Sequence, residues 1–520
     1  MLRIARSSLL RRGACAAAGC VAAGAAVSSL ASQCEAAQNT VSAVDIIERP
    51  RQQWIEVEQQ ELADSFVDFA NPDTAYVEAL RALRSAYYLP VSAMASLRDF
   101  FLAEAEAGLK GVPTASLRML PTYVTSRVTG SERGDYYALD LGGTNFRVLR
   151  LTLLGDGKVG PVTQSKFTVP QHIKQGSAEE LFGFLADSVA TFLATQCGGN
   201  PSGKLGFTFS FPTDQSAIDE GKLVVWNKDF AASGCIGEDV VGLLRRELVA
   251  RGIMLEVQAL ANDTVGTMEA AAYAHPSTAM GVILGTGTNA AYIERGANVT
   301  KWRGPPCDEM VINTEWGNLD AASVMNVYDA AIDAASANPT LQRFEKMISG
   351  MYLGELCRVS VTSPEVLPAF SEGFAGALQS AFGERMSLPS SLMAAIEADT
   401  SADLRKAAAA LAAAGVPHST LRDRVLMREA CVGISTRAAR LAAVGIVSLL
   451  AQMGGAGGSG GATVAVDGTV FECYPYFKER MEFGVELLLG KAAAAEVDLL
   501  LAKDGSGVGA AIIAAIARPQ

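Results

Sequence analysis

Apolar residues recur at helical spacing from position 45 to position 107. This periodicity predicts helices that each bury one face, and the run 71–73, Asn-Pro-Asp, predicts a loop or a helix start between them. The predicted buried positions are Tyr76, Leu80, Leu83, Tyr87, Leu97, Phe100 and Phe101.

Short strands are predicted next. Residues 205–210 alternate between large apolar and small or polar side chains, which is typical of a strand, and Pro212 ends it. Ser210 is therefore expected at a strand end beside a loop. Residues 257–260 form another apolar strand, and a helix is predicted over 265–274. Asp263 lies at the junction of that strand and that helix.

Two segments share the pattern strand, glycine turn, strand. Residues 139–147 read Leu-Asp-Leu-Gly-Gly-Thr-Asn-Phe-Arg, and residues 284–289 read Leu-Gly-Thr-Gly-Thr-Asn. Glycine leaves no Cβ in the way, so backbone N–H groups can approach an anion closely. The alternative for the first segment is an ordinary hairpin with a Gly-Gly turn. The pairing of the two segments favours two similar α/β halves that each contribute one phosphate loop.

The C-terminal part is predicted to be mostly helical from 321 to 440, with alanine-rich stretches such as 407–414. Residues 454–461 are a glycine-rich linker. A strand over 463–467 ends in Asp-Gly-Thr, and the Gly/Ser loop 504–507 opens a final helix. The N–H groups at the start of that helix suit an anion or the edge of a nucleotide.

Composition narrows the class of protein. The 520 residues are 49% hydrophobic and 19% charged, which is typical of a soluble globular enzyme with two to four domains. The net charge of −12 argues against nucleic-acid binding. The nine cysteines contain no Cys-x-x-Cys pair and the three histidines show no metal spacing, so neither zinc nor redox chemistry is predicted. Scattered free cysteines fit a reducing compartment.

The first 44 residues stand apart from the rest. They carry four arginines, contain no acid before Glu35, and include a weakly apolar run over 13–34. This composition is typical of an organelle transit peptide, and the run is also long enough for a membrane anchor. A disordered tail is the third alternative. Plastid or mitochondrion is therefore the expected location, with the cytosol as the alternative.

A second set of polar residues suits a sugar, which needs many directional donors and acceptors. Phosphoryl transfer to a hydroxyl also needs a carboxylate that takes the proton, and Asp263 is the candidate. The alternative for Asp263 is an N-cap of the helix that follows, and the two glutamates of the set could be solvated surface acids. The set is Ser210, Asn227, Lys228, Asn262, Asp263, Asn289, Glu315 and Glu345.

Taken in chain order, these segments resemble the motifs of the eukaryotic hexokinase family. The resemblance runs from roughly residue 56 to the C-terminus, and the length is similar to that of single-unit members of about 50 kDa rather than the fused double kind. The segments are 139–147, 205–212, 226–230, 262–267, 284–289, 313–317, 343–355, 466–469 and 504–507.

The resemblance implies a two-lobed α/β architecture, the hexokinase/actin-like ATPase (ribonuclease H-like) fold, with five-stranded mixed sheets and a cleft between a large and a small lobe. Residues 45–276 would be the N-terminal hexokinase region and 277–517 the C-terminal one. The small lobe would be built mostly from 117–261. The N-terminal helices would join the large lobe, and the last helix would return to the small lobe.

The resemblance also implies an ATP- and Mg²⁺-dependent transfer to the 6-hydroxyl of glucose, and of fructose and mannose, as the first step of glycolysis. Asp263 would be the general base, Lys228 would bind sugar and stabilise charge, and the remaining sugar set would hold hydroxyls. Asp140 would hold Mg²⁺ through water. The nucleotide would contact Asp140, Gly142, Gly143, Thr144, Asn145, Arg147, Gly285, Thr286, Gly287, Gly468, Thr469, Gly505 and Ser506.

One departure from the family concerns the sugar segment, residues 226–230. The family has Thr and Gly where this chain has Asn227 and Asp229, and Asp229 adds a negative charge beside the cleft. Two rival functions are a catalytically weak glucose-binding sensor and an actin- or chaperone-like ATPase with a protein client. The intact Asp263 and both glycine turns favour the kinase. The partner would be a hexose, and the chain is expected to be a monomer or weak dimer.

Overall fold

The computed structural model describes residues 73–143, 145–226, 229–454 and 461–517. The predicted targeting segment 1–44 lies outside this part of the chain. So do most of the 454–461 linker and three predicted site residues, Thr144, Asn227 and Lys228.

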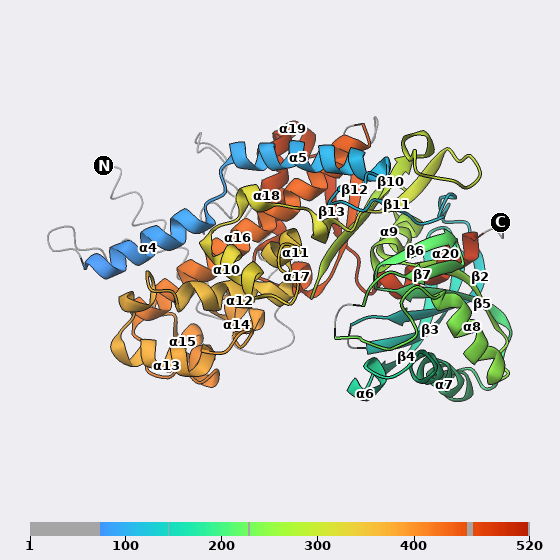
Figure 1. The fold of residues 1–520 in the computed structure, drawn as a ribbon, viewed down its shortest axis with the longest axis horizontal. Coiled ribbons are helices and arrows are strands. Elements are labelled where there is room, and N and C mark those ends of the chain that lie inside the picture. The colour runs from blue at the N-terminus through green and yellow to red at the C-terminus, as the bar shows by residue number, and fades with distance from the viewer. Residues whose placement is uncertain (1–72, 144, 227–228, 455–460, 518–520) are drawn as a thin grey trace, which may run out of the picture. The chain divides into compact units, whose positions relative to one another are not determined.

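A five-stranded mixed sheet, in the order β4-β3-β2-β5-β8, forms the centre of the small lobe. Figure 1 labels β2, β3, β4 and β5 of this sheet. The strands β2, β3 and β4 are antiparallel neighbours, whereas β5 and β8 run parallel to β2. Helices α7 (Ala178–Gln196) and α8 (Val240–Ala250) contribute to the apolar core on one face. The strands are β2 (Arg133–Leu141), β3 (Asn145–Gly155), β4 (Lys158–Thr168), β5 (Gly203–Phe209) and β8 (Leu255–Ala261).

The predicted alternation along β5 does not separate a buried face from an exposed one. All five residues from Leu205 to Phe209 are buried, because α7 and α8 cover one face of the sheet and a C-terminal helix covers the other. Parallel strands that are covered on both sides read as buried along their whole length. The small hairpin β6 (Thr213–Ala217) and β7 (Glu220–Leu223) follows β5.

A second sheet has six strands where five were predicted, in the order β1-β11-β10-β9-β12-β13. The additional strand is the two-residue β1, which pairs antiparallel with β11 through Leu120 and Asn313. Its brevity explains why no periodic pattern signals it. The strands are β1 (Leu120–Pro121), β9 (Thr278–Leu284), β10 (Thr288–Arg295), β11 (Glu309–Asn313), β12 (Ala462–Asp467) and β13 (Val497–Leu501).

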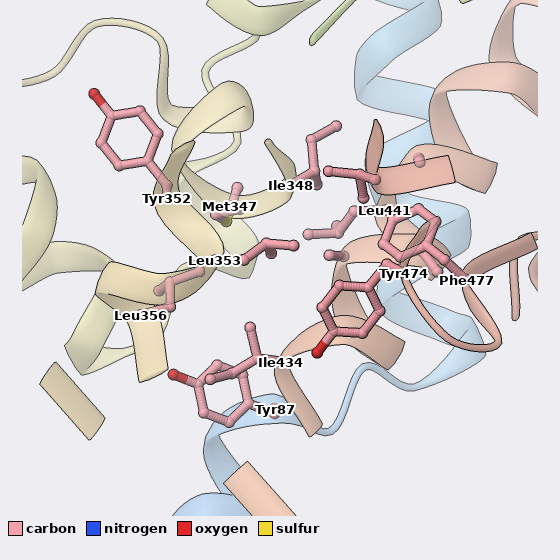
Figure 2. Packing of buried hydrophobic residues seen from close by; sticks show 14 of the residues in the cluster. Tyr87, Met347, Ile348, Tyr352, Leu353, Leu356, Ile434, Leu441, Tyr474 and Phe477 are labelled. Atoms are coloured by element: carbon pink, nitrogen blue, oxygen red, sulfur yellow. The ribbon is translucent and has the colours of Figure 1, made fainter. Parts of the chain in front are cut away.

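Helices surround this second sheet and complete the large lobe, which confirms the helical prediction for 321–440. Their apolar faces meet in one core, where Tyr87, Ile434, Leu441 and Phe477 come together from distant parts of the chain (Figure 2). The main helices are α4 (Thr74–Tyr87), α5 (Val91–Leu109), α10 (Val327–Ala335), α11 (Arg343–Ile348), α12 (Gly350–Val361), α13 (Glu372–Phe382), α14 (Ser390–Glu397), α15 (Arg405–Ala413), α16 (Leu421–Gln452), α17 (Thr469–Cys473) and α18 (Phe477–Leu489).

The two N-terminal helices bury the predicted faces with one exception. Asp73 caps α4, since its side chain accepts from the Tyr76 N–H at 3.3 Å. Phe100 is 38% exposed, so its predicted burial is wrong. The buried stripe of α5 runs through Met94, Leu97 and Phe101, and at 100° per residue Phe100 falls to the side of that stripe.

The helix α16 is long and apolar enough to cross a membrane by length and composition. However, 89% of its most apolar window is buried inside the protein, which is the property of a core helix. A capping box starts it: the Thr420 side chain accepts from the Asp423 N–H, and the Asp423 side chain accepts from the Thr420 N–H. The weakly apolar run 13–34 lies outside the described residues.

Two helices connect the sheets. The helix α9 (Asp263–Ala274) packs against β9 and against α20 (Gly505–Ile516), and α20 lies on β2 and β5 of the small lobe (Figure 1). A Cβ at Gly281 of β9 would lie 2.7 Å from the Met268 nitrogen, so the approach of α9 to the strand requires glycine there. This packing holds the start of α9, and with it Asp263, at the boundary of the two sheets.

Candidate active site

A single pocket collects every described member of the predicted sugar set. Ser210 follows β5, Asn262 and Asp263 follow β8, and Asn289 and Glu315 come from β10 and the residues after β11. Glu345 reaches the pocket from α11. The pocket is also lined by Phe211 and Pro212. The second glycine loop, which consists of Gly285, Thr286 and Gly287 between β9 and β10, contributes Gly287 to the lining. Hydroxyl, amide and carboxylate groups thus converge from both sheets on one concave site.

The N-cap alternative for Asp263 is wrong, because Asn262 takes that role. The Oδ1 atom of Asn262 accepts from the Thr264 N–H at 3.1 Å, and Asp263 is the first helical residue of α9. Its own Oδ1 also accepts from the Thr264 N–H, at 2.9 Å. A carboxylate in the first turn interacts favourably with the helix dipole. The half-buried carboxylate of Asp263 therefore lines the pocket at a well-defined position.

Buried Asn313 connects Asn289 and Glu315 of the sugar set through hydrogen bonds. Asn289 Nδ2 donates to Asn313 Oδ1 at 2.8 Å, and Asn313 Nδ2 donates to Glu315 Oε1 at 2.9 Å. Glu315 has a left-handed backbone with φ of 53°, which is rare outside glycine. Asn313 is buried and was absent from the predicted set, although it opens the segment 313–317 that carries Glu315.

Glu345 connects the sugar pocket to the second glycine loop. Its Oε2 accepts from the Thr288 N–H at 3.1 Å, directly after the loop, and a Cβ at Gly287 would lie 2.8 Å from the same oxygen. The start of α12 fixes the other side of the loop. There the Gly350 N–H donates to the Gly285 carbonyl at 2.8 Å, and the Met351 N–H donates to the Thr286 carbonyl at 3.2 Å.

The first glycine loop consists of Gly142 and Gly143 with residue 144, between β2 and β3. The predicted hairpin is confirmed: β2 and β3 pair throughout, and the Gly142 N–H donates to the Asn145 carbonyl at 3.0 Å. Asp140 at the end of β2 pairs with Arg147 on β3, whose Nε lies 3.0 Å from Asp140 Oδ2.

Ser506 of α20 and Asp504, the residue directly before that helix, bind to Asp140 and Arg147. Ser506 Oγ donates to Asp140 Oδ2 at 3.0 Å, and Arg147 Nη1 lies 2.6 Å from Asp504 Oδ1. Arg147 is therefore held between two carboxylates. Burial tends to lower the pKa of Arg147, but the two carboxylates outweigh this effect and raise it. Asp504 belongs to the recognised segment 504–507 but was not among the predicted site residues.

The loop after β12 lies against the second glycine loop. Gly468 has φ of 119°, and a Cβ on it would lie 2.7 Å from the Gly285 nitrogen, so no other residue fits there without displacement. Thr469 begins α17 and Gly505 begins α20. The pKa of Asp467 is raised to about 6, mainly by burial and also by the nearby Asp504, while the Gly468 N–H and Arg147 oppose the rise.

The sugar segment is bounded by an aromatic cluster. Trp226 and Phe230 stack with ring centroids 5.3 Å apart, and Phe211 contacts both rings edge-on at 4.8 and 5.0 Å. Asp229 is exposed and left-handed, with φ of 66°. Aspartate is one of the few residues other than glycine that adopt this conformation readily.

Among the described residues no group of three or more His, Cys, Asp and Glu could hold a metal ion, and the three histidines are exposed. The described cysteines are all free. Lys174, on the short helix α6 (Gln171–Lys174), is buried beside the first glycine loop, and no sequence pattern pointed to it.

Comparison with known proteins identifies the family. Two family models, both described as hexokinase, match residues 79–273 and 279–516. The chain belongs to the hexokinase family. Hexokinase-1 of Arabidopsis thaliana is 40% identical over 453 residues, which are 84% of this chain and 90% of that protein. Hexokinase-1 of Spinacia oleracea is 40% identical over 443 residues, 82% of this chain and 88% of that protein.

Solved structures agree with this assignment. The hexokinase from Schistosoma mansoni, in complex with glucose, superimposes with a TM-score of 0.75 at 35% identity, covering 88% of this hexokinase and 99% of that chain. A second hexokinase crystal structure gives a TM-score of 0.73 at 32% identity, with the same coverage. The prediction of a two-lobed, actin-like kinase fold is confirmed, and the protein is a hexose phosphotransferase.

Proposed function

We propose that this hexokinase transfers the γ-phosphoryl group of ATP to the 6-hydroxyl of glucose, and also of fructose and mannose, as the first step of glycolysis. The observation that carries the proposal is the single pocket in which the described sugar set, Asp263 included, meets Gly287 of the second glycine loop. A hydroxyl acceptor and a phosphate-binding loop are thereby adjacent, as direct transfer requires.

Each sugar-set residue has a role in this proposal. Asp263 orients the attacking hydroxyl and accepts its proton as the new bond forms. Glu315, held by Asn313, and Glu345, held by the Thr288 N–H, present fixed carboxylate oxygens to other hydroxyls. Asn227 and Lys228, outside the described residues, complete the set by resemblance, with Lys228 stabilising developing negative charge.

The nucleotide would lie along the two glycine loops and the starts of α17 and α20. Mg²⁺ suits Asp140: the hydrogen bonds described for this carboxylate, from Arg147 and Ser506, all go to Oδ2, so Oδ1 can accept from a metal-bound water. The ion would neutralise charge on the phosphates. Arg147 and Thr286 would lie beside the phosphates, and Arg147 is already oriented by Asp140 and Asp504.

Sugar binding should close the two lobes, because the sugar set comes from elements of both sheets. Closure excludes water, which would otherwise compete with the sugar as the acceptor. Saturating glucose is expected to raise the melting temperature and reduce the radius of gyration in X-ray scattering. An unchanged radius at saturating glucose would refute closure.

The function is tested by a coupled assay with ATP and glucose, fructose or mannose, alongside glucose binding by calorimetry. Turnover of glucose with ATP supports the proposal, and the kcat/KM ratio ranks the three hexoses. Glucose binding without turnover would instead support the catalytically weak sensor. Absence of both would reject the substrate assignment. Sedimentation analysis of the same sample tests the expected monomer or weak dimer.

The segment 1–44 is proposed to address the enzyme to a plastid or mitochondrion, as a transit peptide or outer-membrane anchor, because it is arginine-rich and acid-poor. Every residue of the proposed site lies far beyond it, so a chain that begins at residue 45 should keep full kcat. Residues 1–45 fused to a fluorescent protein should localise to the organelle. A diffuse cytosolic signal would reject the targeting role.

A further inference from the structure

We propose that Lys174 is a positioning residue that ties the first glycine loop to the sugar segment, so that the two substrate sites are held in one arrangement. The proposal rests on the proposed roles of that loop in phosphate binding and of that segment in sugar binding. Lys174 belongs to neither region in sequence. Two of its groups make the contacts: its ammonium, which reaches both regions, and its backbone carbonyl.

The ammonium group fixes the glycine loop. Lys174 is only 7% exposed, and its Nζ donates to the Gly143 carbonyl at 2.7 Å. This bond restrains the backbone of the loop at Gly143. Phosphate loops bind through backbone donors that are held in place. Lys174 thereby positions a loop that is proposed to face the nucleotide, without touching the nucleotide itself.

The same side chain contacts the sugar segment. Nζ lies 5.1 Å from the centroid of the Phe230 ring, within the range of a cation–π interaction. Phe230 is 5% exposed and stacks on Trp226 at the other end of the segment. A displacement of the sugar segment therefore moves the ring against which Lys174 packs.

The backbone forms the third link. The Lys174 carbonyl accepts from the Ala231 N–H at 2.8 Å, and the Gly176 carbonyl accepts from the Ser233 N–H at 2.9 Å. The Ser233 carbonyl in turn accepts from the Ala178 N–H at 2.8 Å. These bonds join the turn after α6 to the chain that leaves the sugar segment, so the two move together.

The electrostatic environment of the buried Lys174 indicates a second role, in nucleotide binding. Within the part of the chain that the structure describes, no carboxylate lies within ion-pair distance of Lys174, whereas buried lysines are ordinarily paired. Its described partners are a carbonyl and an aromatic face. A polyanion bound in the glycine loop would supply the missing negative charge. Lys174 should therefore favour nucleotide binding as well as orient the loop.

The test compares Lys174→Met, which keeps the stem but removes the charge and the donor, with the matched control His172→Met on the exposed side of the same helix. Lys174→Met should lower kcat/KM for ATP roughly 10- to 100-fold, because small misplacement of reacting groups is that costly. Lys174→Arg, which keeps a cationic donor, should recover part of the loss, and His172→Met should match the wild type.

Hydrogen–deuterium exchange provides a readout besides activity. In Lys174→Met the amides of residues 139–147 and 226–231 should exchange faster, while the large-lobe core helix α16 is unchanged. The proposal would be overturned if Lys174→Met had the same kinetics and the same exchange rates as the wild type. It would also be overturned if the variant had a lower melting temperature with unchanged kcat/KM. If Lys174→Met does not fold, Lys174→Arg becomes the deciding variant. The proposal requires that exchange in both segments of Lys174→Arg differ from that of the wild type. An inactive wild type would refute the proposed function instead.

Discussion

Gly509 of α20 lies against the carbonyl group of Gly266 of α9 so closely that a Cβ at position 509 would overlap the carbonyl oxygen. At the other side of the same contact, a Cβ at Gly266 would lie 2.6 Å from the Ser506 carbonyl oxygen. The two helices therefore meet backbone to backbone. This contact places Asp263, at the start of α9, and Ser506, at the start of α20, at the same boundary between the sheets.

Gly509→Ala should force these helices apart. Overpacking of this kind costs about 1–3 kcal/mol, and the higher helix propensity of alanine, worth about 1 kcal/mol, offsets only part of it. The variant should have a lower melting temperature and a lower kcat. Gly376→Ala is the matched control, because Gly376 lies in the exposed face of α13 with open space around it. That variant should be as stable as the wild type or more so, and an equally stable Gly509→Ala would contradict the close contact.

Asp263→Asn tests the general base. Because the amide preserves shape but cannot take a proton, kcat should fall about 10²–10⁴-fold while glucose affinity and melting temperature change little. Asn262 remains available to cap α9. The control is Asp214→Asn on the exposed surface of β6, which should leave kcat unchanged. A near-normal kcat for Asp263→Asn would end the base assignment.

Glu345→Gln tests the sugar role of the carboxylate on α11. The amide oxygen of glutamine can still accept from the Thr288 N–H, so the second glycine loop should keep its shape. What is lost is the charge that strengthens a hydrogen bond to a sugar hydroxyl. Calorimetry should show a larger loss of glucose affinity than of nucleotide affinity. Equal losses would indicate that Glu345 acts mainly by supporting the loop.

Glu269 should make stability depend on pH. The pKa of Glu269 is raised to about 7, mainly by burial and to a smaller extent by Glu132, against the opposing effects of Arg127 and the Val128 backbone amide. The Oε2 atom of Glu269 is buried and has no hydrogen-bond partner among the described residues, an environment that disfavours the charged form. Because the folded state binds this proton more tightly than the unfolded state, the contribution of Glu269 to stability is greatest below about pH 4.5 and is lost as the pH rises through 7.

Glu269→Gln removes this titration. The difference in unfolding free energy between variant and wild type should change by about 3 kcal/mol between pH 4.5 and pH 8, in favour of the variant at high pH. Asp467, with its pKa raised to about 6, titrates in the same pH range, so the unfolding free energy of Glu269→Gln still depends on pH through Asp467. Denaturant titrations at several pH values measure the difference. Parallel curves for the two proteins would show that Glu269 ionises normally.

The sequence by itself determined the elements that depend on local patterns. The apolar spacing of Tyr76, Leu80 and Leu83 located α4, and the two glycine turns located both hairpins, since backbone conformation there follows from nearby residues. The residues by themselves left Glu315 and Glu345 open as surface acids. The resemblance of their segments to hexokinase motifs assigned them to the sugar set, whose described members line the pocket.

Only the tertiary structure decided which groups meet across long separations. No local pattern predicts that Lys174 donates to Gly143 or that Asp504 binds Arg147. Likewise Phe100 has an apolar side chain but lies outside the buried stripe. Hydrogen bonds and burial depend on which surfaces the packed helices and sheets bring together, and this is a property of the whole fold rather than of neighbouring residues.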